Sequence, residues 1–156
     1  MLRSEPSATG KGLEGNRRPG RVNQLMATRA LKPRRILVVD DEPLVCDSIK
    51  RMLVFDGHDV DIATSGQQAL VLFEKKKFDL IIIDYRMPEM RGDRLASLIR
   101  ARVADQRILM ISATAQTLHP SDRELADVDA IIGKPFPLEE LREAISSLLP
   151  SGESAA

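Results

Sequence analysis

Short, wholly apolar segments alternate along this chain with longer segments in which apolar residues recur every three or four positions. The short segments predict strands that are buried on both faces of a parallel sheet. We place these strands at residues 36–39, 60–63, 80–83, 107–111 and 130–132. Strands that alternate with helices in this way indicate an α/β fold, a doubly wound five-stranded parallel sheet with helices on both faces.

The longer segments predict the helices between these strands. The first helix is expected over residues 43–55, where Pro43 suits the first turn and Gly57 suits a left-handed residue after the end. Ser65 is placed to cap the second helix, and a third is expected over residues 93–103. Four apolar positions mark the last helix: Leu138, Leu141, Ile145 and Leu148.

The composition is that of one globular domain of ordinary size. Of the 156 residues, 43% are hydrophobic and 29% are charged, which suffices for a packed core. Trp is absent and Tyr occurs once, which argues against a sugar- or nucleic-acid-binding surface lined with aromatic rings. The single cysteine, Cys46, excludes an intrachain disulfide and favours a cytoplasmic location. No apolar run approaches the roughly 18 residues that a membrane span needs, so no membrane role is expected.

A formal net charge of zero hides an uneven distribution of charge. Residues 1–35 hold nine Lys or Arg and two Glu, a net charge of about +7. We interpret residues 1–33 as a disordered basic arm, residues 34–150 as the folded domain and residues 151–156 as a disordered tail. Three other interpretations of the arm stay open: translation that starts at Met26, a transit peptide, and an arm that binds nucleic acid.

Polar side chains of related chemistry follow four of the predicted strands. Asp40 and Asp41 follow the first strand, Asp84 the third, Ser112 the fourth and Lys134 the fifth. Because ligands of an open parallel sheet bind beyond the carboxyl ends of the strands, we expect these side chains to converge on one edge.

These residue types fit together as a site of phosphoryl transfer. Clustered carboxylates repel one another and favour a bound cation, and Mg²⁺ prefers one or two carboxylates together with phosphate oxygens. An aspartate carboxylate can attack phosphorus and form an acyl phosphate. A lysine and a hydroxyl group can stabilise the charge on the transferred group. The pattern therefore predicts a phosphoryl-transfer site in which an aspartate is the nucleophile and Mg²⁺ is the cofactor.

Four segments carry a family resemblance: ILVVDDE, LIIIDYRMPEMRG, ILMISA and the KPF that begins at Lys134. In this order and at these spacings they resemble the receiver domain of bacterial two-component response regulators, of the chemotaxis-regulator type. The resemblance runs from about residue 35 to residue 149. It implies a flavodoxin-like fold with the strand order 2-1-3-4-5.

By this resemblance, Asp84 is the phosphoacceptor and also a ligand of Mg²⁺. Asp41 would bind Mg²⁺ directly, Asp40 directly or through water, and the backbone carbonyl of Arg86 would complete the protein ligands. The side chain of Arg86 stands where the family tunes hydrolysis of the acyl phosphate. We expect it to shield the phosphorus and to slow dephosphorylation.

The resemblance also assigns roles to the ends of the last two strands. Ser112 would hydrogen-bond one phosphoryl oxygen, and Lys134 would pair with another. The Lys134–Pro135 peptide bond is expected to be cis, as is usual in the family. Ile131 departs from the family, which has Tyr or Phe there. The usual relay between a hydroxyl residue and an aromatic ring therefore cannot operate in its normal form.

Pro120 lies in the segment that normally forms the fourth helix of the family. Because proline is tolerated only in the first turn of a helix, we expect this helix to start late, with Ser121 and Glu124 as its capping box. The fourth-helix face is the usual output surface and also takes part in homodimers. A weak homodimer through this atypical face stays open.

The resemblance implies a stand-alone receiver that takes its phosphoryl group from a histidine kinase or a histidine phosphotransfer protein. It would signal by phosphorylation-dependent binding of an unidentified protein, and it would not be a turnover enzyme. The alternative is a degenerate receiver that docks proteins independently of phosphorylation, for which Ile131 leaves room. A dehalogenase-like phosphatase is disfavoured, because Arg86 stands where that family needs a second Asp. No helix-turn-helix module is recognisable, so specific nucleic-acid binding is not expected.

Overall fold

The computed structural model of the chain describes residues 32–118 and 122–150. Strands, helices and two short 3-10 turns follow one another along these residues. In chain order the elements are β1 (Arg35–Val39), α2 (Pro43–Phe55), β2 (Asp59–Ala63), α3 (Gly66–Lys75), β3 (Leu80–Asp84), α4 (Gly92–Arg102), β4 (Arg107–Ser112), η1 (Ala115–Thr117), η2 (Arg123–Leu125), β5 (Ala130–Gly133) and α5 (Leu138–Leu148).

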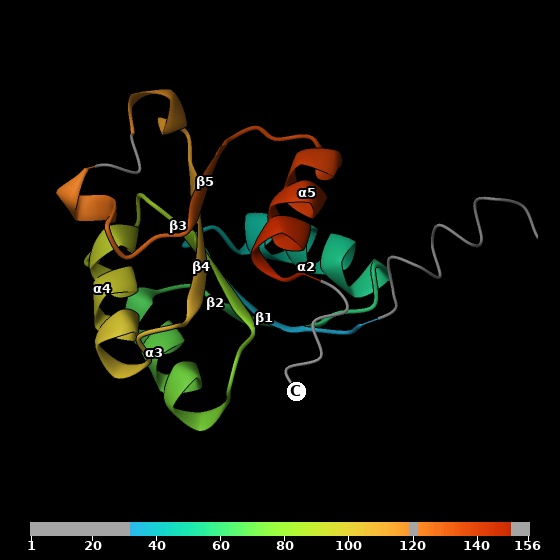
Figure 1. Cartoon of the computed structure of the whole chain (residues 1–156), viewed down its shortest axis with the longest axis horizontal. Coiled ribbons are helices and arrows are strands. Elements are labelled where there is room, and N and C mark those ends of the chain that lie inside the picture. Colours follow the sequence, from blue (N-terminus) through green and yellow to red (C-terminus); the bar gives the residue numbers. More distant parts are fainter. Residues whose placement is uncertain (1–31, 119–121, 151–156) are drawn as a thin grey trace, which may run out of the picture.

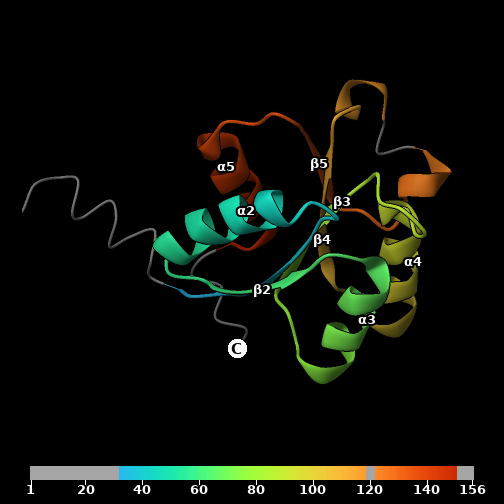
Figure 2. The ribbon, with the colours of Figure 1, turned by 180° about the vertical axis from the view of Figure 1, so that it is seen from behind.

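The strands form one five-stranded parallel sheet in the order β2-β1-β3-β4-β5, which confirms the predicted fold. Its register pairs Ile36 with Val60 on one side and with Leu80 on the other. Helices α2 and α5 cover one face of the sheet and α3 and α4 cover the opposite face, as Figures 1 and 2 show from opposite sides. Because all strands run in the same direction, their carboxyl ends share one edge.

The alternation of side chains along the strands divides the core into two halves. On β1, Leu37 and Val39 pack in the half that includes residues of α3 and α4, whereas Ile36 and Val38 pack in the half that includes residues of α2 and α5. Strand β3, at the centre of the sheet, is buried along its whole length. Its only polar residue is the last one, Asp84, so the strand places one carboxylate at the carboxyl edge of the sheet.

Local sequence signals set the helix ends as predicted. Helix α2 begins at Pro43, and Gly57 follows it with a φ of 96°. The N–H of Gly57 donates to the carbonyl of Val54 at 2.9 Å, which satisfies a carbonyl at the helix end. The Oγ of Ser65 accepts a hydrogen bond from the N–H of Gln68 at 3.1 Å and so caps α3.

The prediction of a late-starting fourth helix is wrong for the residues that the structure describes. Between β4 and β5 these residues form only the 3-10 turns η1 and η2, and Asp122 is the residue that precedes η2. A proline offers no N–H and disfavours helical backbone at the residue before it. A helix here could therefore start only at Pro120, and the stretch that remains before β5 is too short for a stable α-helix. Ser121 lies outside the described residues, and the capping box predicted for it with Glu124 does as well.

Residues 1–31 and 151–156 lie outside the described part of the chain. The predicted basic arm, apart from its last two residues, the start at Met26 and the tail therefore stay predictions. Among residues 32–118 and 122–150, no helix combines the length and the apolar character needed to cross a membrane.

Candidate functional site

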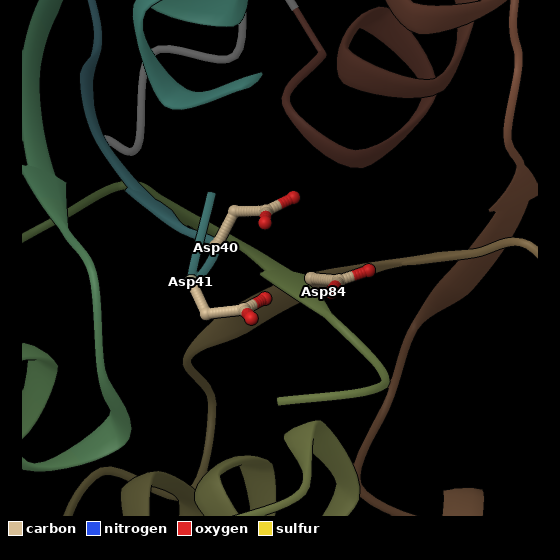
Figure 3. A group of neighbouring side chains, drawn as sticks. All are labelled: Asp40, Asp41 and Asp84. Atoms are coloured by element: carbon tan, nitrogen blue, oxygen red, sulfur yellow. The ribbon is translucent and has the colours of Figure 1, made fainter. Parts of the chain in front are cut away.

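Three carboxylates gather at the carboxyl edge of the sheet, where β1 and β3 end side by side. Asp40 and Asp41 directly follow β1, and Asp84 is the last residue of β3. Figure 3 shows their side chains directed to the same side of the strand ends. One carboxylate oxygen from each residue lies within 4.8 Å of the others. Asp40 and Asp84 are buried and Asp41 is half-buried, so the cluster is largely shielded from solvent.

Lys134 is the cationic partner of this cluster. Its Nζ donates to Oδ2 of Asp40 at 2.7 Å and lies 3.1 Å from Oδ1 of Asp84. The peptide bond between Lys134 and Pro135 is cis. Burial alone would lower the pKa of Lys134, but its hydrogen bonds to the two aspartates outweigh burial and raise that pKa. The ammonium group is therefore charged at neutral pH.

The donor set suits a hard divalent cation. A single ammonium group does not balance three carboxylates, and oxygen ligands this close together are what Mg²⁺ prefers. Asp40 already accepts the N–H of Glu42 on Oδ1 at 2.9 Å and Lys134 on Oδ2. Asp41 and Asp84 could therefore hold such an ion directly, and Asp40 could hold it directly or through water.

The pKa of Asp84 is raised to about 6, mainly because burial removes hydration from the charged carboxylate. Repulsion from Asp40 adds to this rise, and the charge and hydrogen bond of Lys134 partly offset both effects. At pH 7 Asp84 is still mainly a carboxylate, the form in which an aspartate can act as a nucleophile without a general base. Keeping it charged is, however, unfavourable to the folded state without a metal.

We therefore expect Asp84→Asn to stabilise the metal-free protein at pH 7 by about 1–3 kcal/mol. The folded-state pKa of Asp84 lies above its unfolded value, so the folded state is penalised as the pH rises from about 4 to about 6, and fully above that. Urea unfolding with a chelator present, at several pH values, measures the difference. The gain should vanish below about pH 4; a variant less stable than the wild type at pH 7 would contradict this account.

Ser112, the predicted phosphoryl ligand, lies fully buried at the end of β4. Its Oγ accepts the N–H of Thr114 at 3.0 Å and lies 3.0 Å from the Oγ1 of Thr114. The hydroxyl of Ser112 is thus engaged by its own loop. We did not predict Thr114 from the sequence, although a second hydroxyl two residues after the first, in a turn that favours side-chain bonds to the backbone, was an available signal.

Neither Arg86 nor Ile131 belongs to the cluster of three carboxylates. Arg86 is exposed on the loop after β3, a loop that the N–H of Gly92 closes by donating to the carbonyl of Tyr85 at 2.8 Å. Ile131 lies on β5, is half-buried, and packs against the core half that includes residues of α3 and α4. Its hydrocarbon side chain can neither donate nor accept a hydrogen bond.

Comparison with known proteins agrees with this architecture. The family model of the response regulator receiver domain matches residues 36–146. Response regulator MprA from Mycolicibacterium vanbaalenii is 35% identical over 131 residues, which cover 80% of this chain and 57% of that protein. Transcriptional regulatory protein TrcR from Mycobacterium tuberculosis is 31% identical over 117 residues, covering 75% and 46%. The chain thus spans about half the length of the curated relatives that it matches.

Solved structures give the same result. The response regulator TrrA from Thermotoga maritima, in complex with Mg²⁺–BeF, is 36% identical, with a TM-score of 0.68 over 74% of this chain and 98% of that chain. The chemotaxis protein CheY4 from Vibrio cholerae is 27% identical, with a TM-score of 0.69 over 76% and 100%. With its acidic cluster, its lysine and its strand order in place, this chain belongs to the family of response regulator receiver domains.

Proposed function

We propose that this chain works as a receiver that accepts a phosphoryl group on Asp84 and signals by binding another protein in a phosphorylation-dependent way. The observation that carries the proposal is one cluster of three carboxylates in which Lys134 contacts both Asp84, at 3.1 Å, and Asp40, at 2.7 Å. The match to 98% of the TrrA chain and 100% of the CheY4 chain supports a domain that needs no second module to fold.

The chemistry follows from the side chains at the cluster. A carboxylate oxygen of Asp84 attacks phosphorus, a new P–O bond forms, and the bond from phosphorus to the donor breaks. With a phosphohistidine donor, the imidazole nitrogen leaves with the electron pair. Lys134 pairs with one oxygen of the transferred group, and the Ser112 hydroxyl donates to another. A bound Mg²⁺ would offset the repulsion between the phosphoryl oxygens and the carboxylates.

The related protein TrrA suggests the cofactor and the partner. TrrA has been solved with Mg²⁺–BeF and in complex with the histidine kinase ThkA. On the family resemblance we assign Mg²⁺ to Asp41, Asp84 and the backbone carbonyl of Arg86, with Asp40 binding directly or through water. The donor would be a histidine kinase or a histidine phosphotransfer protein in the cytoplasm. Because the group ends on the protein itself, we do not class the chain as a turnover enzyme.

Intact-protein mass after incubation with acetyl phosphate tests the proposal. The wild type should gain one phosphoryl group with Mg²⁺ and none with a chelator, and Asp84→Asn should gain none under either condition. Absence of any gain in the wild type, repeated with a phosphorylated histidine phosphotransfer domain as donor, would instead favour the docking module that acts independently of phosphorylation.

The phosphorylated lifetime depends on Arg86 in this proposal. The side chain is exposed and two residues from Asp84, where a long chain can cover the path of an attacking water. We expect Arg86→Asn to shorten the lifetime of the acyl phosphate by about three- to ten-fold, measured as loss of phosphoprotein after the donor is removed. Arg94→Asn, at an exposed arginine on α4, is the matched control. An unchanged lifetime in Arg86→Asn would refute the shielding role.

A further inference from the structure

Two hydroxyl groups are in contact at the end of β4. The Oγ of Ser112 accepts the backbone N–H of Thr114 at 3.0 Å, and the two side-chain oxygens are 3.0 Å apart, with either one able to be the donor. A serine hydroxyl can donate one hydrogen bond and accept two. The N–H of Thr114 uses one acceptor position of Ser112. The remaining acceptor position and the single proton are left for the Thr114 hydroxyl and one further group.

We propose that Thr114 is a positioning residue for the phosphoryl-binding hydroxyl of Ser112, and that it carries the phosphorylation signal into the turn η1. This inference rests on the proposed function. When the Ser112 hydroxyl donates its hydrogen bond to a phosphoryl oxygen, the Thr114 hydroxyl must become the donor to Ser112 Oγ. Ser112 then makes all three hydrogen bonds that it can make. A hydroxyl that accepts two hydrogen bonds is polarised as a donor, which strengthens its charge-assisted bond to the phosphoryl group.

Burial distinguishes the two hydroxyls in a way that suits these roles. Ser112 is fully buried, so its hydroxyl depends on protein partners, whereas Thr114 is half-buried and can exchange a partner with solvent. Reversing the Ser112–Thr114 hydrogen bond therefore leaves no buried polar group without a partner. Phosphorylation would fix the direction of a bond that has two directions available in the resting protein.

Thr114 is also the residue on which η1 is built. Its carbonyl accepts the N–H of Thr117 at 3.0 Å and the Oγ1 of Thr117 at 2.9 Å. Ala115, the first residue of η1, lies next to Gly133, where an added Cβ would be 3.4 Å from the Cβ of Ala115. Gly133 directly precedes Lys134. A change at Ser112 can therefore reach η1 through Thr114. The turn η1 itself contacts the end of β5, which Lys134 directly follows.

Position 131 offers no equivalent route. Ile131 packs in the core half that includes residues of α3 and α4 and has no polar atom in its side chain. It can fill space when Ser112 moves, but it cannot take over a hydrogen bond. The hydroxyl of Thr114 is bonded to Ser112 in this structure, so we assign the coupling to Thr114.

Titration with beryllofluoride and Mg²⁺, followed by NMR of backbone amides, tests this inference with a phosphoryl analogue and no turnover. Thr114→Val removes the hydroxyl and keeps the shape and the N–H. It should weaken beryllofluoride binding by about three- to ten-fold, the size expected for one hydrogen bond, and abolish the shift changes at residues 115–117. Thr114→Ser should restore both. Thr117→Val, which removes a hydroxyl of the same turn that bonds to Thr114 and not to Ser112, should bind within about two-fold of the wild type.

Each other outcome has a definite meaning. Wild-type affinity in Thr114→Val with the η1 response intact overturns the inference. So does a loss that Thr114→Ser fails to restore, because that pattern reports a packing defect. Failure of the wild type itself to bind beryllofluoride with Mg²⁺ would overturn the proposed function, and the inference with it.

Discussion

Replacing Lys134 with methionine is expected to lower the rate of Asp84 phosphorylation by acetyl phosphate by about a hundred-fold or more, as for other positioned charges in active sites. The Nζ of Lys134 lies 3.1 Å from Oδ1 of Asp84, where it can stabilise the negative charge on the oxygens of a phosphoryl group that Asp84 accepts. It also holds down the pKa of Asp84, which burial and Asp40 raise. Without the ammonium group, a smaller fraction of Asp84 is nucleophilic at pH 7, so the two losses act together.

The matched control for this experiment is Lys77→Met. Lys77 is exposed just before β3, at the opposite end of the strand from the acidic cluster, so the variant alters the total charge equally and leaves the site intact. Its rate should equal that of the wild type. A Lys134→Met rate within about three-fold of the wild type would show that the lysine has no role in phosphoryl transfer.

Gly92→Ala is expected to destabilise the fold by about 2–4 kcal/mol, measured by urea unfolding. A Cβ at Gly92 would lie 3.0 Å from the Cα of Tyr85 and 2.9 Å from the Cγ2 of Ile83, and still closer to the carbonyl oxygen of Asp84. Two of these three atoms belong to the backbone of the central strand and of the loop that follows it, so they cannot move aside cheaply. The chain must therefore separate α4 from the residue that we propose as phosphoacceptor.

The control for this experiment is Gly133→Ala, at the last residue of β5. There the nearest atom to an added Cβ is the Cβ of Ala115 at 3.4 Å, an ordinary van der Waals contact. We expect a change below about 1 kcal/mol, since neither backbone nor core has to shift. Equal stability of the two alanine variants would contradict the close approach of α4 to Asp84.

The apolar runs of the sequence were sufficient to predict five buried parallel strands, because strands buried on both faces tolerate few polar residues, whereas the order of the strands came from the family resemblance. The convergence of Asp40, Asp84 and Lys134 followed as well, since the carboxyl ends of neighbouring parallel strands must meet. Each of these residues stands directly at or after a strand end. Their grouping required only the strand order, without any side-chain conformation.

Features that depend on individual side-chain conformations were not predictable in this way. The pairing of Lys134 with both Asp40 and Asp84 needs one particular conformation of the lysine side chain. The bond between Ser112 and Thr114 depends on how the chain turns after β4. The segment between β4 and β5 shows the other limit: its described residues form 3-10 turns and no α-helix, and the helix predicted from the sequence was wrong for them. A proline raises the cost of helix formation, and a short segment has few further hydrogen bonds to offset it.

The most direct test of the central claim is to map the acyl phosphate by borohydride reduction, which converts a phosphorylated aspartate to homoserine. After treatment with acetyl phosphate and Mg²⁺, peptide mass spectrometry should find homoserine at position 84 alone, and at no position when Mg²⁺ is chelated. Homoserine at position 40 or 41 would contradict the assignment of Asp84 as acceptor. A phosphorylated wild type without homoserine at any aspartate would show that the chain carries its phosphoryl group in another chemical form.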